Sequence, residues 1–521
     1  MDYSTLKEHT FRECGAGGLV LARRPWELED DEWQDCQNVQ FVAGAVRRTP
    51  GFSSFGIPAA GVRVVSGYGY KDGDSTTVHG YVVVTANRIY KKTRTAGGTL
   101  DANWVDLSRA NFANVISGVL PNETNPDVGF DLYRTSLYIA PGDNAVQFFN
   151  GATLATLGGS PPNCRDFMVY GERGLAARLR TGAPASQGEF RWSDAGNLAT
   201  GWAAANNAKA ERLPSVALKF KRTGQYVFCY KADGIERILI TPDSVKPFRT
   251  DIVHDGIGLA GTHGSNTGGV VSYYADDFFV GQSGIYRFSG GRLEDIGRGV
   301  FTPVIGDLMM SAVGLLAGEK PQHVRAYADL DEILFSNNLT YNPKWATWGK
   351  RVLGEDLSFV ATGWHNIPLV GRFDSNLSMA SMFSFATTRN DEVYIQDANN
   401  LSVPSEWVSA GAANSNVVSK WFDMGTRRMK RWTRHVIDFD RQAGTTMTIE
   451  YRTFNSTHEN PAGSTNADRY KSVSFVCSGA AQKIDLNLTG RFLEFKPINN
   501  SNGAFWRFLN HTLVWQEFEW D

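Results

Sequence analysis

The side chains able to carry out metal or phosphate chemistry are scattered along this 521-residue chain. The nine histidines form no H-E-x-x-H pair, and His254 and His263 stand nine residues apart in a Gly-rich stretch. A metal site at these two histidines competes with the alternative of loop histidines that face solvent or a backbone partner. The chain contains no G-x-x-x-x-G-K-[ST] phosphate loop and no G-x-S-x-G nucleophile elbow. These patterns predict no metal site, no cofactor and no nucleophilic catalysis.

Acidic residues are the remaining candidates for catalysis, because glycosidases place two carboxyl groups about 5–10 Å apart. The candidate acids stand beside predicted strand starts, and they are Asp276, Asp277, Asp329, Asp331 and Glu332. Acids at such positions commonly bond the backbone of a turn. We therefore predict no catalytic residue and no enzymatic activity, with a pair such as Asp277 and Asp329 as the alternative that a glycosidase would need.

One further stretch bears on that alternative. Ser193 to Trp202, SDAGNLATGW, resembles the Asp-box turn of sialidases, S-x-D-x-G-x-T-W. Here Ser193 and Asp194 are adjacent and Trp202 falls too late, so the spacing departs from the sialidase pattern.

Composition and charge narrow the class of protein. Lys and Arg number 52 and Asp and Glu 54, which disfavours a tight binder of duplex DNA because such proteins carry a strong basic excess. Five cysteines without a C-x-x-C pair argue against a disulfide framework and indicate a reducing compartment. The N-terminus lacks a signal-peptide design, and no apolar run approaches 18 residues. We expect a soluble protein made in a cytoplasm, with no membrane span.

Short β-rich runs closed by Gly, Asn, Asp or Pro predict an all-β fold. Strand–turn–strand phrases begin at Val82, Tyr138, Phe228, Phe278, Ile333 and Phe383. Their spacings are 56, 90, 50, 55 and 50 residues, and the gap of 90 can hold one degenerate unit near Gly174. A recurrence near 50 residues is the size of a propeller blade. Residues 56–400 are therefore predicted to form a β-propeller of six or seven blades, with hairpins in two sandwiches as the alternative.

The two ends of the chain differ from this recurrence. Residues 1–55 read as an N-terminal arm with an acidic helix over Leu28–Val39 and a hairpin that turns at Gly44. A second helix is predicted over Pro303–Leu316, where Pro303 would lie in the first turn. Residues 401–521 alternate apolar and polar side chains, which predicts a C-terminal β-sandwich of at least six strands.

The arm is expected to contact protein, either a neighbouring subunit or its own ring. Trp26, Trp33 and Phe41 are too apolar to remain in water, at about 1.5–3 kcal/mol each. We predict that all three dock on a protein surface.

A cationic run surrounds Trp432 at the start of the C-terminal domain. It consists of Arg427, Arg428, Lys430, Arg431 and Arg434. Such a run fits phosphates or an acidic protein surface, and the acidic stretch Glu27–Asp35 of another subunit is the preferred partner. The alternative is an edge strand that its charges keep soluble.

The arm also carries a longer pattern. After an acidic stretch, it contains Trp33, Asp35, Asn38, Val39, Phe41, Gly44, Val46, Arg47, Pro50 and Gly51. This string resembles the opening of tail-tube proteins of short-tailed phages (podoviruses), the nozzle or packaged-DNA-stabilisation class. The phrases LYIAPGDNAVQFFNGATLATLGGSPPN, FFVGQSGIYRFSGGRLEDIG and NNLTYNPKWATW are also similar, so the resemblance covers most of residues 19–350. Cys36 stands where the family favours a small residue, and the C-terminal 120 residues carry no motif of the family.

The resemblance implies a structural virion protein of a bacteriophage tail, with a propeller body. Six copies would form a homohexameric ring below the portal and its adaptor, retaining the packaged genome and conducting it during ejection. The implied partners are the portal adaptor, tail fibre or needle proteins, and double-stranded DNA that passes without sequence-specific binding. The near-neutral charge agrees with a conduit, because a basic lumen would bind the DNA phosphates. The alternative function is a propeller that binds glycans or hydrolyses them.

Overall fold

The computed structural model describes most of the chain. The described residues are 5–49, 51–60, 64–71, 78–85, 88–95, 101–107, 128–142, 144–179, 189–203, 206–209, 217–259, 270–281, 283–300, 324–327, 332–335, 339–350, 356–362, 368–373, 393–397, 415–439, 445–457, 459, 468–477, 480–499 and 506–518. In these ranges the regular structure consists of strands, and no helix occurs. The all-β prediction is confirmed.

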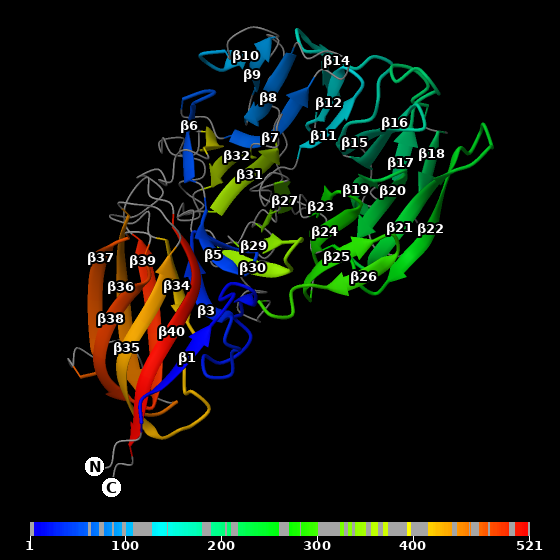
Figure 1. Ribbon diagram of the computed structural model, residues 1–521. Helices are drawn as coiled ribbons and strands as arrows, with labels where there is room; N and C mark the ends of the chain where they lie inside the picture. Colours follow the sequence, from blue (N-terminus) through cyan, green and yellow to red (C-terminus); the bar gives the residue numbers. More distant parts are fainter. Residues whose placement is uncertain are drawn as a thin grey trace, which may run out of the picture.

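Seven units of four antiparallel strands occur in the described part of the chain (Figure 1). Unit 1 comprises β7 (Val64–Lys71), β8 (Val78–Thr85), β9 (Ile89–Thr95) and β10 (Val105–Asp106). Unit 2 comprises β11 (Gly129–Tyr133), β12 (Ser136–Ala140), β13 (Gln147–Phe149) and β14 (Leu154–Thr156). Unit 3 comprises β15 (Cys164–Tyr170), β16 (Arg173–Leu179), β17 (Glu189–Trp192) and β18 (Asn207–Lys209). Unit 4 comprises β19 (Ala217–Thr223), β20 (Tyr226–Lys231), β21 (Gly234–Ile240) and β22 (Phe248–Asp255).

The last three units continue this order. Unit 5 comprises β23 (Val270–Tyr273), β24 (Asp276–Val280), β25 (Ile285–Ser289) and β26 (Arg292–Asp295). Unit 6 comprises β27 (Val324–Tyr327), β28 (Glu332–Phe335), β29 (Leu339–Asn342) and β30 (Thr347–Lys350). Unit 7 takes β31 (Asp356–Thr362), β32 (Pro368–Phe373) and β33 (Val393–Asp397), and its fourth strand is β6 (Gly51–Gly56) from the N-terminal segment.

The recurrence found in the sequence coincides with the second strand of each unit. Val82, Tyr138, Phe228, Phe278 and Ile333 lie in β8, β12, β20, β24 and β28. The degenerate unit near Gly174 is unit 3, where that glycine lies in β16. Phe383 lies outside the described residues. The second strand recurs most clearly because it is buried on both faces, as in β12 and β24, where four of five residues are buried.

Neighbouring units touch through their first strands. β11 contacts β15, β15 contacts β19, β19 contacts β23, β23 contacts β27, and β27 contacts β31. Units 1 and 2 join where Tyr68 stacks on Phe130, 5.4 Å between ring centroids, and where Tyr70 donates a hydrogen bond to Thr135 O at 2.8 Å. β31 of unit 7 also contacts β7 of unit 1. Each unit therefore contacts the next along the chain, and unit 7 contacts unit 1.

A second module consists of two sheets that bury a common core. One contains β1 (Lys7–Phe11), β40 (Arg507–Phe518), β35 (Met429–Phe439) and β38 (Gln482–Gly490). The other contains β2 (Gly18–Leu19), β3 (Glu32–Gln37), β34 (Ser415–Ser419), β39 (Phe492–Asn499), β36 (Thr446–Phe454) and β37 (Tyr470–Val476). Trp432 and Leu513 from the first sheet meet Tyr451 and Phe495 from the second in one buried cluster.

The predicted helix over Leu28–Val39 is wrong, because this segment contains β3. The three-residue spacing of Trp33, Cys36 and Val39 mimics a helical period. In the structure a register shift between Trp33 and Asp35 inserts one residue, so that Trp33 and Cys36 both face the core from a strand. The other predicted helix, Pro303–Leu316, lies outside the described residues.

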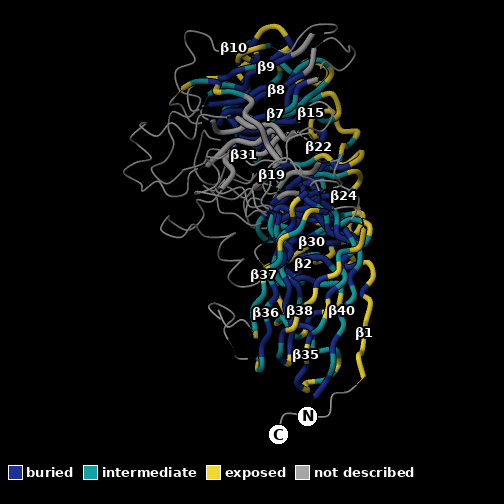
Figure 2. The backbone as a smooth tube through the Cα atoms, turned by 60° about the vertical axis from the view of Figure 1, so that its left-hand side comes forward, coloured by how far each residue is buried: buried dark blue, intermediate teal, exposed yellow. Residues whose placement is uncertain are grey.

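The N-terminal segment joins the two modules. β4 (Val39–Val42) pairs with β30 of unit 6, and β5 (Ala45–Arg48) pairs with β4 and with β40. One ten-stranded sheet therefore runs from unit 6 into the second module. The opposite edge of this sheet is β38, and β1, whose exposed residues are visible in Figure 2, pairs with β40 alone.

Candidate functional site

The residues of the N-terminal string build the joint between the two modules. Asn38, at a φ of +53°, turns the chain from β3 into β4. Its backbone N–H donates a hydrogen bond to Lys350 O of unit 6 at 2.9 Å. Ala43 and Gly44 both have positive φ, as the tight turn between β4 and β5 requires. Thr347 Oγ1 donates to Phe41 O at 2.8 Å. The string thus fastens unit 6 by backbone bonds that any change of register would break.

A buried arginine completes this joint. Arg48 is 2% exposed, and its guanidinium donates to Asn499 Oδ1 at 2.8 Å. Burial lowers the pKa of Arg48 to about 10, which leaves the side chain charged at neutral pH. Arg47, the arginine of the string, donates to Gln40 Oε1 across the hairpin at 3.0 Å. Both arginines therefore position strands of this chain.

The aromatic residues of the arm are covered by the chain itself. Trp33 is 3% exposed, and its Nε1 donates to Cys14 O at 2.6 Å. Phe41 is 2% exposed and lies in the same buried cluster. Trp26 is half-buried against Trp421, 5.5 Å between ring centroids. These side chains dock on protein as expected, but the surface belongs to the same chain and not to a neighbouring copy.

The acidic stretch of the arm is likewise paired within the chain. Glu32 bonds Arg23 at 3.0 Å, and Asp30 bonds Lys420 at 3.0 Å. Asp35 lies 3.6 Å from Lys350 of unit 6. The pairing of this stretch with Arg427–Arg434 of another subunit stays a prediction.

The cationic run begins in the turn before β35 with Arg427 and Arg428 and continues into β35, which pairs with β40 on one side and with β38 on the other. The alternative of an edge strand is therefore wrong. Arg427, Arg428, Arg431 and Arg434 are exposed, and Arg434 pairs with Asp485 at 3.1 Å. Arg431 and Arg434 lie on an outward face of the sheet, Arg427 and Arg428 lie in the turn that leads into it, and we call the four together the β35 arginines.

Lys430 departs from its neighbours in the run. It is fully buried, and its ammonium donates to the carbonyl oxygens of Thr426, of Arg428 at 2.9 Å, and of Arg491 at 3.2 Å. Burial lowers the pKa of Lys430 to about 8. Lys430 therefore holds the turn before β35 in place and offers no charge to a partner.

The candidate catalytic acids that the structure describes have structural roles. Asp277 is fully buried and accepts hydrogen bonds from Thr223 Oγ1 at 2.6 Å and Ser272 Oγ at 2.7 Å. Asp276 pairs with Arg287 at 2.6 Å. Glu332 is 2% exposed, and Asp329 and Asp331 lie outside the described residues. The carboxylate of Asp277 is thus occupied by hydrogen bonds within the chain.

Metal ligands and reactive thiols do not gather in the described part of the chain. No group of three His, Cys, Asp or Glu side chains there could hold a metal ion. His254 lies in β22, and His263 is outside the described residues. All five cysteines are free and buried. Burial raises the pKa of the Cys36 and Cys164 thiols, which keeps them protonated and unreactive.

Sequence reasoning missed a row of polar residues that links the units. The third residue of each first strand is polar in units 2 to 5: Asp131, Asp166, Lys219 and Ser272. Asp131 Oδ2 accepts from Val169 N of unit 3 at 2.6 Å, and Asp166 bonds Lys219 Nζ of unit 4 at 2.9 Å. Burial raises the pKa of Asp131 to about 6. The repeated polar third position, as in GFDLY and CRDFMVY, is the signal that could have revealed this row.

Comparison with known proteins gives only weak similarity. No protein-family model matches the chain, and no curated protein matches it. Among solved structures, the computationally designed Ika8 protein matches at a TM-score of 0.35 and 9% identity, covering 73% of this chain and 99% of that one. YCF48 bound to D1 peptide matches at 0.36 and 8%, covering 66% and 94%. Apo AztD from Citrobacter koseri matches at 0.31 and 7%, covering 60% and 80%. At these scores the similarities carry no conclusion about function.

A search for membrane-crossing helices gives none among the described residues.

Proposed function

We propose that this protein is a structural virion protein, with no enzymatic activity, that forms the ring-shaped tail tube (nozzle) of a short-tailed phage. In this proposal the seven units are the blades of a β-propeller, and the two sheets of the second module are a β-sandwich. Six copies form a ring below the portal and its adaptor, hold the packaged DNA, and conduct it at ejection. Tail fibre or needle proteins attach to the ring, and the protein resides in the virion tail after synthesis in the host cytoplasm.

The observation that carries the proposal is the joint built by the N-terminal string. The N-terminal string by which the chain resembles the nozzle class contains β4 and β5, which bond unit 6 to the second module, and it ends at Gly51, where the fourth strand of unit 7 begins. A tube under the pressure of packaged DNA needs rigid modules that do not separate. A continuous sheet from unit 6 to β40 supports that property, because separation would break several ladder hydrogen bonds together.

The β35 arginines support a role in assembly. Arg431 and Arg434 lie on the exposed face of a strand paired on both sides, where cations are not needed to protect an edge, and Arg427 and Arg428 lie exposed in the turn before it. A charged outward face fits contact with an acidic surface of a neighbouring subunit or of the adaptor.

The experiment that tests the proposal is imaging and native mass measurement of the full chain, alone and mixed with the portal–adaptor complex of the same phage. The expected result is a ring of six copies with an axial hole. Arg427→Glu combined with Arg431→Glu is expected to weaken ring formation, whereas Arg249→Glu, an exposed arginine of β22, leaves it unchanged. Failure to form rings under either condition, or hydrolysis of a polysaccharide by the pure protein, contradicts the proposal.

A further inference from the structure

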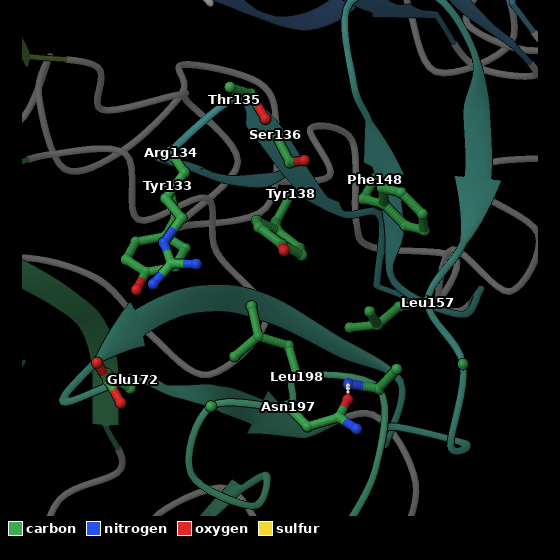
Figure 3. A pocket seen from close by; sticks show the side chains of 13 residues that line it. Tyr133, Arg134, Thr135, Ser136, Tyr138, Phe148, Leu157, Glu172, Asn197 and Leu198 are labelled. Carbon is green, nitrogen blue, oxygen red and sulfur yellow. Dashed lines mark hydrogen bonds between the residues drawn. The ribbon is translucent and has the colours of Figure 1, made fainter. Parts of the chain in front are cut away.

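A pocket lies between units 2 and 3 (Figure 3). Its volume is about 350 Å³, within the usual range for small-molecule sites of about 300–1,000 Å³. Its walls come from the β11–β12 turn, from β12 and β13, and from the β15–β16 turn. The last wall is residues 196–199, which belong to the Asp-box-like stretch singled out in the sequence.

Aromatic rings form one side of this pocket. Tyr133, Tyr138 and Phe148 line it, and Leu157 and Leu198 fill the space beside them. Tyr138 stacks on Phe167, 5.3 Å between ring centroids and 26° between ring planes, which fixes its orientation. Tyr138 itself is 9% exposed, so the half-buried rings of Tyr133 and Phe148 supply most of the apolar surface that a ligand can reach.

Polar groups without partners converge on the same space. Within the described part of the chain, the hydroxyls of Tyr133, Ser136 and Tyr138 and the carboxylate of Glu172 make no hydrogen bond. Burial raises the pKa of Tyr138, so its hydroxyl stays neutral and able to donate or accept. These groups are available for a ligand.

The rim of the pocket carries two planar polar side chains, Arg134 and Asn197, whereas the walls described above are mainly apolar. Arg134 is exposed, and its guanidinium lies 5.2 Å from the ring centroid of Tyr133, inside the pocket opening. Asn197 uses its Oδ1 to accept from Ala199 N at 3.0 Å, and this bond orients the side chain. Arg134 and Glu172 have opposite charges, so this rim does not favour an anionic ligand such as a phosphate.

The walls are held rigidly. Trp202 Nε1 donates to Leu198 O at 2.8 Å, and Gly196 N donates to Glu172 O at 2.9 Å, which ties the 196–199 wall to the β15–β16 turn. Gly159 approaches Ala199 so closely that a Cβ there would lie 1.9 Å from Ala199 O. The site is therefore formed before any ligand arrives, which lowers the entropic cost of binding.

We propose that this pocket binds a neutral hexopyranose unit of a polysaccharide. A pyranose ring has an apolar face of C–H groups, which suits the rings of Tyr133 and Phe148, and adjacent hydroxyls, which suit the planar groups of Arg134, Glu172 and Asn197. Each planar group presents two polar atoms at the spacing of a vicinal diol. The proposal does not depend on the assembly role, because the pocket lies within a single chain.

The test uses the full-length protein and methyl glycosides of glucose, galactose and mannose as probes. Saturation-transfer NMR is expected to show binding of at least one glycoside, with a Kd near about 1 mM, as suits a small ligand in an open site. Arg134→Ala and Asn197→Ala are expected to weaken binding about tenfold, and Tyr138→Phe about threefold, the range expected for loss of one hydrogen bond.

Tyr274→Ala provides the matched control. Tyr274 is 82% exposed and stands at positive φ in the β23–β24 turn, the position in unit 5 that corresponds to Arg134 in unit 2. Unchanged binding by this variant supports the proposal. The proposal is overturned if no glycoside binds, if an acidic sugar such as methyl glucuronide is the sole ligand, or if Tyr274→Ala weakens binding as much as the pocket variants do.

Discussion

Two histidines are bonded to each other in the core of the second module. His435 Nε2 lies 3.0 Å from His511 Nδ1, and His435 Nδ1 lies 3.0 Å from Tyr451 Oη. Burial lowers the pKa of His435 to about 3 and that of His511 well below its usual value. Both imidazoles are therefore neutral in the folded protein, and each must gain a proton on unfolding in mild acid.

The sign of the resulting pH dependence follows from the lowered pKa values. Between the unfolded pKa near 6.5 and the folded pKa near 3, the unfolded chain binds more protons than the folded one. Stability is therefore fully present above about pH 6.5 and falls as the pH decreases, by up to about 1.4 kcal/mol per pH unit for each histidine.

Replacing one histidine checks this dependence. His511→Gln keeps an amide that can bond His435 and removes one titrating group, so the stability curve between pH 4 and 6 is expected to become flatter. Urea unfolding at a series of pH values measures it. An unchanged slope in the variant would mean that other groups cause the acid sensitivity.

Because Trp33 is buried, we predict that shortening its side chain lowers the free energy of unfolding by a large amount. Trp33 packs edge-on against Phe495 and Phe508, 5.9 Å between ring centroids in each case. Trp33→Ala is expected to lower the free energy of unfolding by about 3–5 kcal/mol, because it leaves a cavity in the shared core. Trp345→Ala, at a side chain that is 42% exposed, is expected to change it by less than about 0.5 kcal/mol. Equal losses in chemical denaturation of the two variants would contradict this assignment.

At the residue scale, the sequence predicted which side chains need cover but not what covers them. Trp33 and Phe41 are apolar enough to require burial, and they are buried. The aromatic partners of Trp33 come from β39 and β40, more than 400 positions away, and no local pattern connects them. For the same reason no local pattern predicted that Asp30 and Asp35 of the acidic stretch pair with Lys420 and Lys350.

At the scale of elements, the hairpins could be predicted from the sequence, but the strand that completes the last four-stranded unit could not. The second strands recur because their burial on both faces demands apolar runs, and turn residues mark their ends. The helix over Leu28–Val39 was mispredicted because a β-bulge reproduces a three-residue spacing. The use of β6 as the fourth strand of unit 7 depends on pairing across more than 330 residues, which strand patterns alone do not specify.

The position of β4 and β5 inside a sheet predicts slow hydrogen exchange. Both strands have partners on each side, so their amides exchange only when the joint between the modules opens. Peptides covering 39–48 are expected to exchange as slowly as those of β35. β1, an edge strand paired with β40 alone, is expected to exchange much faster. Equally fast exchange of 39–48 and β1 in mass spectrometry would show that the joint is open in solution.

At the scale of the whole molecule, the charge distribution sets the expected interaction with DNA. The chain carries a net charge of −2, and its dense cationic group, the β35 arginines, belongs to the second module rather than to the first strands of the units. The polar row on those first strands mixes Asp131 and Asp166 with Lys219, and its ionic groups bond neighbouring units. Six copies of a chain with this balance of charge would not line the axial hole of the proposed ring with a dense cationic sleeve.

We therefore expect weak binding of duplex DNA, without sequence preference. Sequence reading requires side chains that reach base edges from a helix or ribbon in a groove, and the proposed conduit must release DNA rather than hold it. Non-specific contacts alone give a Kd of about 10⁻⁴–10⁻⁶ M at physiological salt and an affinity that falls steeply as salt rises. Fluorescence anisotropy with two duplexes of unrelated sequence, at several salt concentrations, measures both properties. Sub-micromolar binding that distinguishes the two duplexes would show that the protein recognises DNA, and the conduit proposal would then be wrong.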